Sequence, residues 1–167
     1  MSVGSLKELY FDELGELYDG EEQKTVTLPR LAEAAHAPEL REALVKQCRD
    51  AWLHLERLQL IFTHWGMARR SRRCSGLARI VQESDERLNE PATHLAPDAA
   101  VFGAAHRIAR YEIAAYESAR LYARWLNRLD DARLLEETLE EEARADRRLT
   151  DIADSRIPAS GADLSAA

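Results

Sequence analysis

The stretch LEETLEEEARADRRLTDIA, residues 135–153, is typical of a helix packed in a bundle, yet it carries acids where a core is expected. Alternating steps of four and three residues follow one side of a helix, and they give the stripe Leu135, Leu139, Glu142, Asp146, Leu149 and Ala153. Glu142 and Asp146 interrupt this otherwise apolar stripe. An ionised carboxylate is costly to bury unless it is paired or binds a metal, so two of them require an explanation.

The size and charge of the chain restrict its fold and its partners. At 167 residues, it is long enough for one domain with a sizeable core. A net charge of −7 argues against nucleic acid or anionic lipid as the main partner, because both attract basic surfaces. The sequence contains no apolar run of membrane-spanning length, and its first residues do not resemble a signal peptide. We therefore expect a cytoplasmic protein.

Two smaller features leave alternatives open. The basic run ARRSRRC, residues 68–74, is either a solvated loop or a patch for phosphate groups or nuclear targeting. Cys48 and Cys74 do not form a Cys-x-x-Cys motif. We interpret them as reduced thiols, with a disulfide as the alternative.

The sequence predicts an all-α protein. Gly and Pro gather between long stretches of Ala, Leu, Glu and Arg, which are good helix formers. We expect helices at residues 5–35, 38–65, 75–89, 98–126 and 130–155. Ser5 is a suitable N-cap, whereas Pro29 predicts a kink or a break within the first helix. The bundle is expected to occupy residues 1–157, and the tail, residues 158–167, to be disordered.

The connections predict how the long helices are ordered in space. Short links join the first two long helices and the last two, so each pair should form an antiparallel hairpin. The link of about thirty residues between the hairpins is long enough to run the length of the bundle. This is the single-crossover topology of ferritin-like bundles, whose cores can carry two metal ions.

Acids recur on the inner stripes of two other helices. In the helix at 98–126 the same steps give Ala105, Ala109, Glu112, Tyr116, Ala119, Ala123 and Leu126. In the helix at 5–35 they give Tyr10, Leu14, Leu17, Glu21, Thr25, Leu28 and Ala32. Glu112 and Glu21 are the single acids on these stripes. Acids on three stripes are expected if the helices supply ligands to a metal at one depth.

The helix at 38–65 is less clear, because its most apolar stripe has no acid. Asp50 and His54 lie on the flank of that stripe and face the interior only if the helix buries a wide surface. Asp50 with His54, and Glu142 with Asp146, are four residues apart and so share a helix face, as ligands of one ion must. Di-metal bundles use Glu-x-x-His pairs three residues apart, and both pairs depart from that signature.

Each of these side chains also has a structural interpretation. Acid pairs on a highly charged helix are usually solvated, and Arg144, Arg147 and Arg148 could pair with the acids of the last helix. A single histidine such as His54 is more often a core or surface residue than a metal ligand.

Four motifs together resemble the YciE/YciF family of ferritin-like bacterial proteins. They are LYDGEEQ (17–23), HLERL (54–58), RYEIAAYE (110–117) and LEETLEEEARADRRL (135–149). The resemblance covers the chain from about Leu6 to Ala153. It implies a ferritin-like helical bundle, a homodimer, an association with bacterial stress and a suspected di-iron or similar site, but no settled reaction. Carried over by position, it implies the metal ligands Glu21, Asp50, His54, Glu112, Glu142 and Asp146.

The chain departs from the family pattern at three positions. Ala109 stands where family members commonly have an acid, Asp50 where a glutamate is usual, and Gln47 where a histidine is often found. A shorter carboxylate and missing ligands reduce the capacity for metal. The predicted site therefore binds one ion, binds weakly or is empty, and the sequence leaves these outcomes open.

Two hypotheses on function follow. In the first, the protein holds one or two iron or manganese ions, which suit carboxylate and imidazole ligands, and acts on dioxygen or peroxide. In the second, it is a non-catalytic helical stress protein with a degenerate metal site that works through a dimer or partner surface. The sequence carries neither a nucleotide-binding glycine loop nor a Ser/His/Asp arrangement that would favour a kinase or hydrolase.

Overall fold

The computed structural model describes residues 5–69, 72–89 and 97–156, and every regular element within these ranges is a helix. The helices are α1 (Leu6–Ala34), α2 (Pro38–His64), α3 (Ser75–Leu88), α4 (Pro97–Trp125) and α5 (Leu129–Arg156). The all-α prediction is confirmed, and each helix begins and ends within one residue of the expected bounds. The tail predicted to be disordered, residues 158–167, lies outside the described residues.

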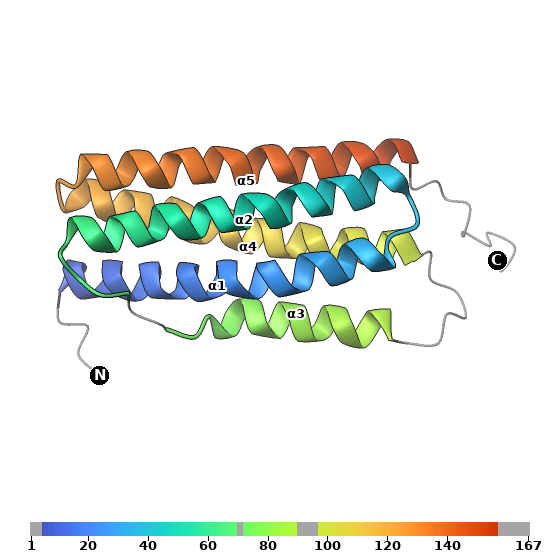
Figure 1. Ribbon diagram of the computed structural model, residues 1–167, viewed down its shortest axis with the longest axis horizontal. Coiled ribbons are helices and arrows are strands. Elements are labelled where there is room, and N and C mark those ends of the chain that lie inside the picture. The colour runs from blue at the N-terminus through green and yellow to red at the C-terminus, as the bar shows by residue number, and fades with distance from the viewer. Residues whose placement is uncertain (1–4, 70–71, 90–96, 157–167) are drawn as a thin grey trace, which may run out of the picture.

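The four long helices lie side by side, and the short α3 runs along their outside (Figure 1). α1 packs against α2 and α4 packs against α5, each pair as an antiparallel hairpin (Figure 1). α1 also contacts α4, and α2 contacts α5, which closes the bundle. Because α3 packs on α4 and α1, the chain between the hairpins returns along the bundle, as expected for one long crossover.

Local signals at the helix ends agree with the sequence. Ser5 caps α1, where its Oγ accepts a hydrogen bond from the backbone N–H of Glu8 at 3.2 Å. Pro38 opens α2, where a missing backbone N–H removes no helical hydrogen bond. Gly66 follows α2 with φ of 61°, a left-handed conformation that glycine adopts without strain.

α1 continues through Pro29 without a break, so the break that was one of the two expected outcomes does not occur. Proline has no N–H, and the carbonyl of Thr25, four residues earlier, therefore loses its helical hydrogen bond. The thiol of Cys48 on α2 donates to that carbonyl, with Sγ 3.8 Å from the oxygen. The neighbouring helix thus compensates in part for the lost bond. Cys48 and Cys74 are both free thiols, as expected.

The apolar core forms two clusters at different depths along the bundle. One contains Leu28, Leu44, Ile108 and Leu149 among others, and the second contains Leu14, Leu58, Tyr116 and Leu135 among others. Between these positions, each long helix supplies buried polar side chains, which we name the polar layer: Glu21, Lys24, His54, Glu112 and Glu142. Helices of similar length in one bundle thereby bring residues far apart in sequence to one depth. In the described ranges, none of the helices has the length and apolar character needed to cross a membrane.

Candidate functional site

The polar layer brings together side chains from all four long helices. Glu21 and Lys24 come from α1, His54 from α2, Glu112 from α4 and Glu142 from α5. None of these residues exposes more than 5% of its surface. Charged groups buried to this extent must be paired, protonated or bound to an ion.

Lys24 connects two of the buried acids. Its Nζ donates a hydrogen bond to Glu142 Oε1 at 2.5 Å and lies 3.0 Å from Glu21 Oε2. Tyr116 supports Glu21 from the side, because its hydroxyl donates to Glu21 Oε1 at 2.9 Å. The ammonium group is therefore the cation that links the carboxylates of α1 and α5.

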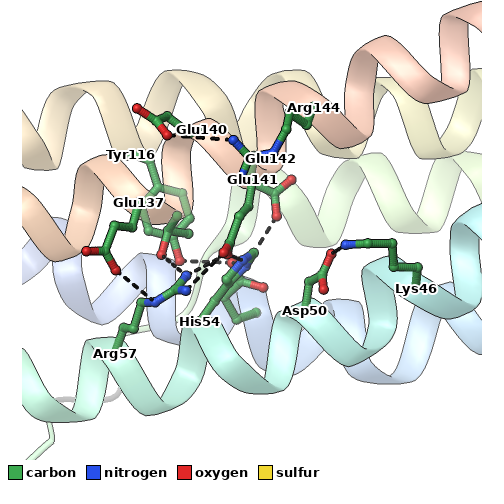
Figure 2. A network of polar contacts seen from close by, with 12 residues as sticks. Lys46, Asp50, His54, Arg57, Tyr116, Glu137, Glu140, Glu141, Glu142 and Arg144 are labelled. Carbon is green, nitrogen blue, oxygen red and sulfur yellow. Dashed lines mark hydrogen bonds and ion pairs between the residues drawn. The ribbon is translucent and has the colours of Figure 1, made fainter.

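His54 is the second cation of the layer. Its Nδ1 lies 3.0 Å from Glu21 Oε1 and 3.3 Å from Glu142 Oε1. Its Nε2 lies 3.0 Å from Glu141 Oε2 (Figure 2). Glu141 is held in turn by the guanidinium of Arg57, with N–O distances of 2.6 and 3.0 Å. The network thus extends from the centre of the bundle to the half-buried surface between α2 and α5.

The surroundings of these groups determine their charges. Burial opposes protonation of His54, but the carboxylates of Glu21 and Glu142 raise its pKa from 6.5 to about 10. Burial likewise opposes the charge of Lys24, yet Glu142 and Glu21 raise its pKa above the ordinary value. Although burial favours the neutral acid, Lys24 and His54 lower the pKa of Glu142 to about 2. Two cations therefore face two carboxylates at neutral pH.

Glu112 differs from the other acids because neither of its carboxyl oxygens has a hydrogen-bond partner among the described residues. Burial raises its pKa well above the ordinary value, which favours the neutral acid. A Cβ at Gly20 would lie 2.6 Å from Glu112 Oε1. The glycine of the LYDGEEQ motif thus leaves the space that the carboxyl group of Glu112 fills.

The other two predicted ligands lie apart from this group. The carboxylate of Asp50 is 2.5 Å from Lys46 Nζ near the surface of α2. Asp146 is buried as expected, but it lies 2.7 Å from His106 Nδ1 and 3.2 Å from Arg110 Nε on α4. The contact with His106 has the distance of an ion pair without the geometry of a hydrogen bond.

Sequence reasoning did not identify Lys24. The step of four residues from Glu21 led to Thr25, which is partly exposed, whereas a step of three leads to the buried Lys24. Both steps follow one helix face, so the spacing alone could have indicated either residue. Among the described residues, Glu21, His54 and Glu142 each place one ligand atom within 4.8 Å of the others, and this buried group could hold a metal ion.

Residues 5–162 match a family described as "Domain of unknown function (DUF892)". The chain belongs to this family. It is 28% identical to the protein YciF of Escherichia coli K12 over 158 residues, which cover 94% of this chain and 95% of YciF. The resemblance found in the sequence motifs is therefore confirmed.

Solved structures give the same relationship. The E. coli stress protein YciF matches with a TM-score of 0.87 and 27% identity, over 93% of this DUF892 chain and 98% of that one. YcfI from Rhodopseudomonas palustris, described as a proposed structural protein, matches with a TM-score of 0.86 and 28% identity, over 89% of this chain and 95% of that one. A protein from Xanthomonas campestris, at 15% identity and a TM-score of 0.73, shares the fold.

The polar layer of this DUF892 protein does not fit two metal ions. Di-metal bundles typically use four carboxylates and two histidines. Here the polar layer contains three carboxylates and one histidine, and Lys24 already forms ion pairs with two of the carboxylates. Asp50 and Asp146, the other two predicted ligands, have partners of their own, and with them the predicted ligands would still include only one histidine. One ion held by Glu21, His54 and Glu142 would have to displace the ammonium group of Lys24.

The acids of the layer should differ in their effect on stability. We expect Glu142→Ala to lower the free energy of unfolding by about 3 kcal/mol, because Lys24 loses one of its two buried partners and must share the carboxylate of Glu21 with His54. Glu112→Leu should leave it unchanged or raise it by about 1 kcal/mol, because Glu112 has no hydrogen bond to lose. Urea denaturation at pH 7 measures both. Equal destabilisation by the two substitutions would contradict this assignment of roles.

The stability should also fall as the pH rises from about 6.5 to about 10. Below this range His54 is protonated in the folded and the unfolded chain, so its ion pairs stabilise the fold fully. Within the range only the folded chain retains the proton, and above it the stabilisation is lost. We expect a loss of up to about 5 kcal/mol, largely absent in His54→Gln. Denaturation at several pH values tests this, and parallel profiles for both proteins would refute it.

Proposed function

We propose that this chain is a non-catalytic, stress-associated protein with a ferritin-like bundle, in which internal cations stand where related bundles hold metal. The main observation in support of this proposal is the position of Lys24, whose Nζ forms ion pairs with the carboxylates of Glu21 and Glu142. The descriptions of the relatives as a stress protein and a proposed structural protein agree with such a role.

Charge balance supports this function. Lys24 and the protonated His54 together supply two positive charges, which is the charge of one divalent ion. They face two carboxylates, so the layer is close to neutral with its own side chains. A divalent ion would gain three ligands, but it would leave the Lys24 ammonium in the core without a partner. The internal arrangement therefore competes with metal for the same oxygens.

A single-ion site is the second candidate, favoured by the short distances between ligand atoms of Glu21, His54 and Glu142. Carboxylate and imidazole ligands suit iron or manganese, which would supply redox chemistry when bound. The chain contributes the oxygens and the ring nitrogen that would hold the ion, with Tyr116 orienting Glu21. This function requires that Lys24 move away from both acids.

Metal content distinguishes the two candidates. We expect wild-type protein, expressed with added iron and manganese and purified without chelator, to contain well below one metal equivalent per chain. Lys24→Met removes the internal ammonium, and about one equivalent is expected to bind to the vacated carboxylates. Lys46→Met, which removes a surface ammonium, should behave as wild type.

Elemental analysis gives the result, and a thermal melt with added Mn²⁺ provides a second readout, because an ion that binds only the folded chain raises Tm. One equivalent in the wild-type protein would support the single-ion candidate. Two equivalents would support the di-metal site implied by the family resemblance. Either result would overturn the metal-independent role.

The proposal includes a homodimer formed through the outer face of α2. This face carries four exposed apolar side chains, which a monomer would leave in water: Val45, Trp52, Leu53 and Leu60. Arg49 and Glu56 are exposed on the same face and have no ion-pair partner among the described residues.

The spacing on α2 is self-complementary. Two copies of α2 can pack antiparallel about a two-fold axis that passes between Trp52 and Leu53. Trp52 of each copy then faces Leu53 of the other copy. The same axis places Val45 opposite Leu60 and Arg49 opposite Glu56. Apolar side chains then meet apolar ones, and each arginine meets an acid, as an isologous interface requires.

Charge reversal tests this dimer. We expect the wild-type protein to sediment as a dimer and Arg49→Glu to dissociate it at least tenfold more readily, because two acids then face each other. Combining Arg49→Glu with Glu56→Arg should restore the dimer. Val26→Glu, an exposed site on α1, is the control and should have no effect. A monomeric wild type, or a double variant no better than the single one, would refute the interface.

A further inference from the structure

A cavity of about 400 Å³ opens between α2 and α5, on a different side of α2 from the proposed dimer face. Lys46, Gln47 and Asp50 line it from α2, and Glu141, Arg144 and Arg148 from α5. Figure 2 shows Lys46 and Asp50 on one helix and Glu141 and Arg144 on the other. The small side chains of Ala43 and Ala145 leave room between the helices. A volume of this size lies in the range of small-molecule sites.

Gln47 provides a buried polar group in this cavity. Only 7% of its surface is exposed, and its side-chain amide makes no hydrogen bond with another described residue. Its amide atoms are not among the fully buried side-chain atoms without a partner, so they reach the open volume of the cavity. The amide of Gln47 is therefore available to an occupant of the cavity.

The charges around Gln47 favour an anion. Lys46 and Asp50 form an ion pair with each other, and Glu141 is already held by Arg57 and His54. Arg148 forms no ion pair within the described ranges. Arg144 has only an exposed partner, Glu140, at 3.6 Å. The lining acids are thus neutralised, whereas two guanidinium groups one helical turn apart remain largely uncommitted.

We propose that this cavity binds a small organic molecule that carries a phosphate or carboxylate group. Arg144 and Arg148 present forked donors to its oxygens, an arrangement that suits both of these groups. The amide of Gln47 donates a further hydrogen bond from the buried side. The remaining volume accepts the rest of the molecule between Ala43 and Ala145. Glu21, Glu142 and His54 do not line the cavity, so it shares no lining residue with the polar layer, although Glu141 in its wall contacts His54.

Titration calorimetry in a low-chloride buffer tests the site with two probes, glycerol 3-phosphate and succinate. We expect saturable binding of at least one of them, with Kd in the millimolar range or tighter. Binding of the first alone would identify a phosphate site, and binding of the second alone a carboxylate site. Arg148→Ala is expected to weaken binding at least tenfold, and Gln47→Leu several-fold.

Arg147→Ala is the matched control, because it removes the neighbouring arginine, which does not line this cavity. It should change Kd less than twofold. Circular dichroism confirms that each variant is folded. The proposal is overturned if the wild-type protein binds neither probe up to tens of millimolar, or if Arg147→Ala weakens binding as much as Arg148→Ala, which would indicate only diffuse attraction of anions.

Discussion

The ion pairs of Lys24 with Glu21 and Glu142 determine how this bundle can pack. A buried ammonium is tolerated only with partners in place, and here one partner, Glu21, lies on α1 itself and the other, Glu142, lies on α5, 118 residues from Lys24. Sliding α1 along α5 by one turn, about 5.4 Å, would separate Lys24 from Glu142 and leave the buried carboxylate of Glu142 without its ammonium partner, whereas Glu21 would move together with Lys24. Two apolar clusters flank the layer and would accept other registers more easily. We therefore assign the choice of helix register largely to the polar layer.

The sequence was sufficient for the helices and for most of the buried acids. Long periodic segments, a capping serine and well-placed prolines fix helix bounds locally, so the predicted and observed bounds agree closely. The depth of Glu21, Glu112 and Glu142 follows from helical periodicity alone. Lys24 could not be separated from Thr25 in this way, because the rotation of α1 about its axis depends on its neighbours. For the same reason, the flank of α2 that carries His54 became buried, while Asp50 on that flank stayed near the surface.

Similarity of fold does not by itself determine whether a chain keeps the side chains that bind a metal. This chain matches YciF along nearly its whole length, yet the chemistry of the core depends on a few side chains. The bundle needs positive charge between its acids, and either a divalent ion or an ammonium with an imidazolium can supply it. Pairing the acids with Lys24 and His54 requires no metal ion, and it couples the stability of the fold to the protonation of His54. A metal would couple stability to ion supply instead.

Glu141 links the centre of the bundle to its surface. One of its oxygens meets His54 Nε2, both meet Arg57, and its side chain also lines the cavity between α2 and α5. Because His54 and Arg57 neutralise it, Glu141 does not consume the charge of Arg144 or Arg148. The ion-pair network therefore has an effect beyond the core. Because it engages Glu141, Arg148 keeps no ion pair within the described ranges and Arg144 has only the exposed Glu140, so both can attract an anion although the protein as a whole carries a net charge of −7.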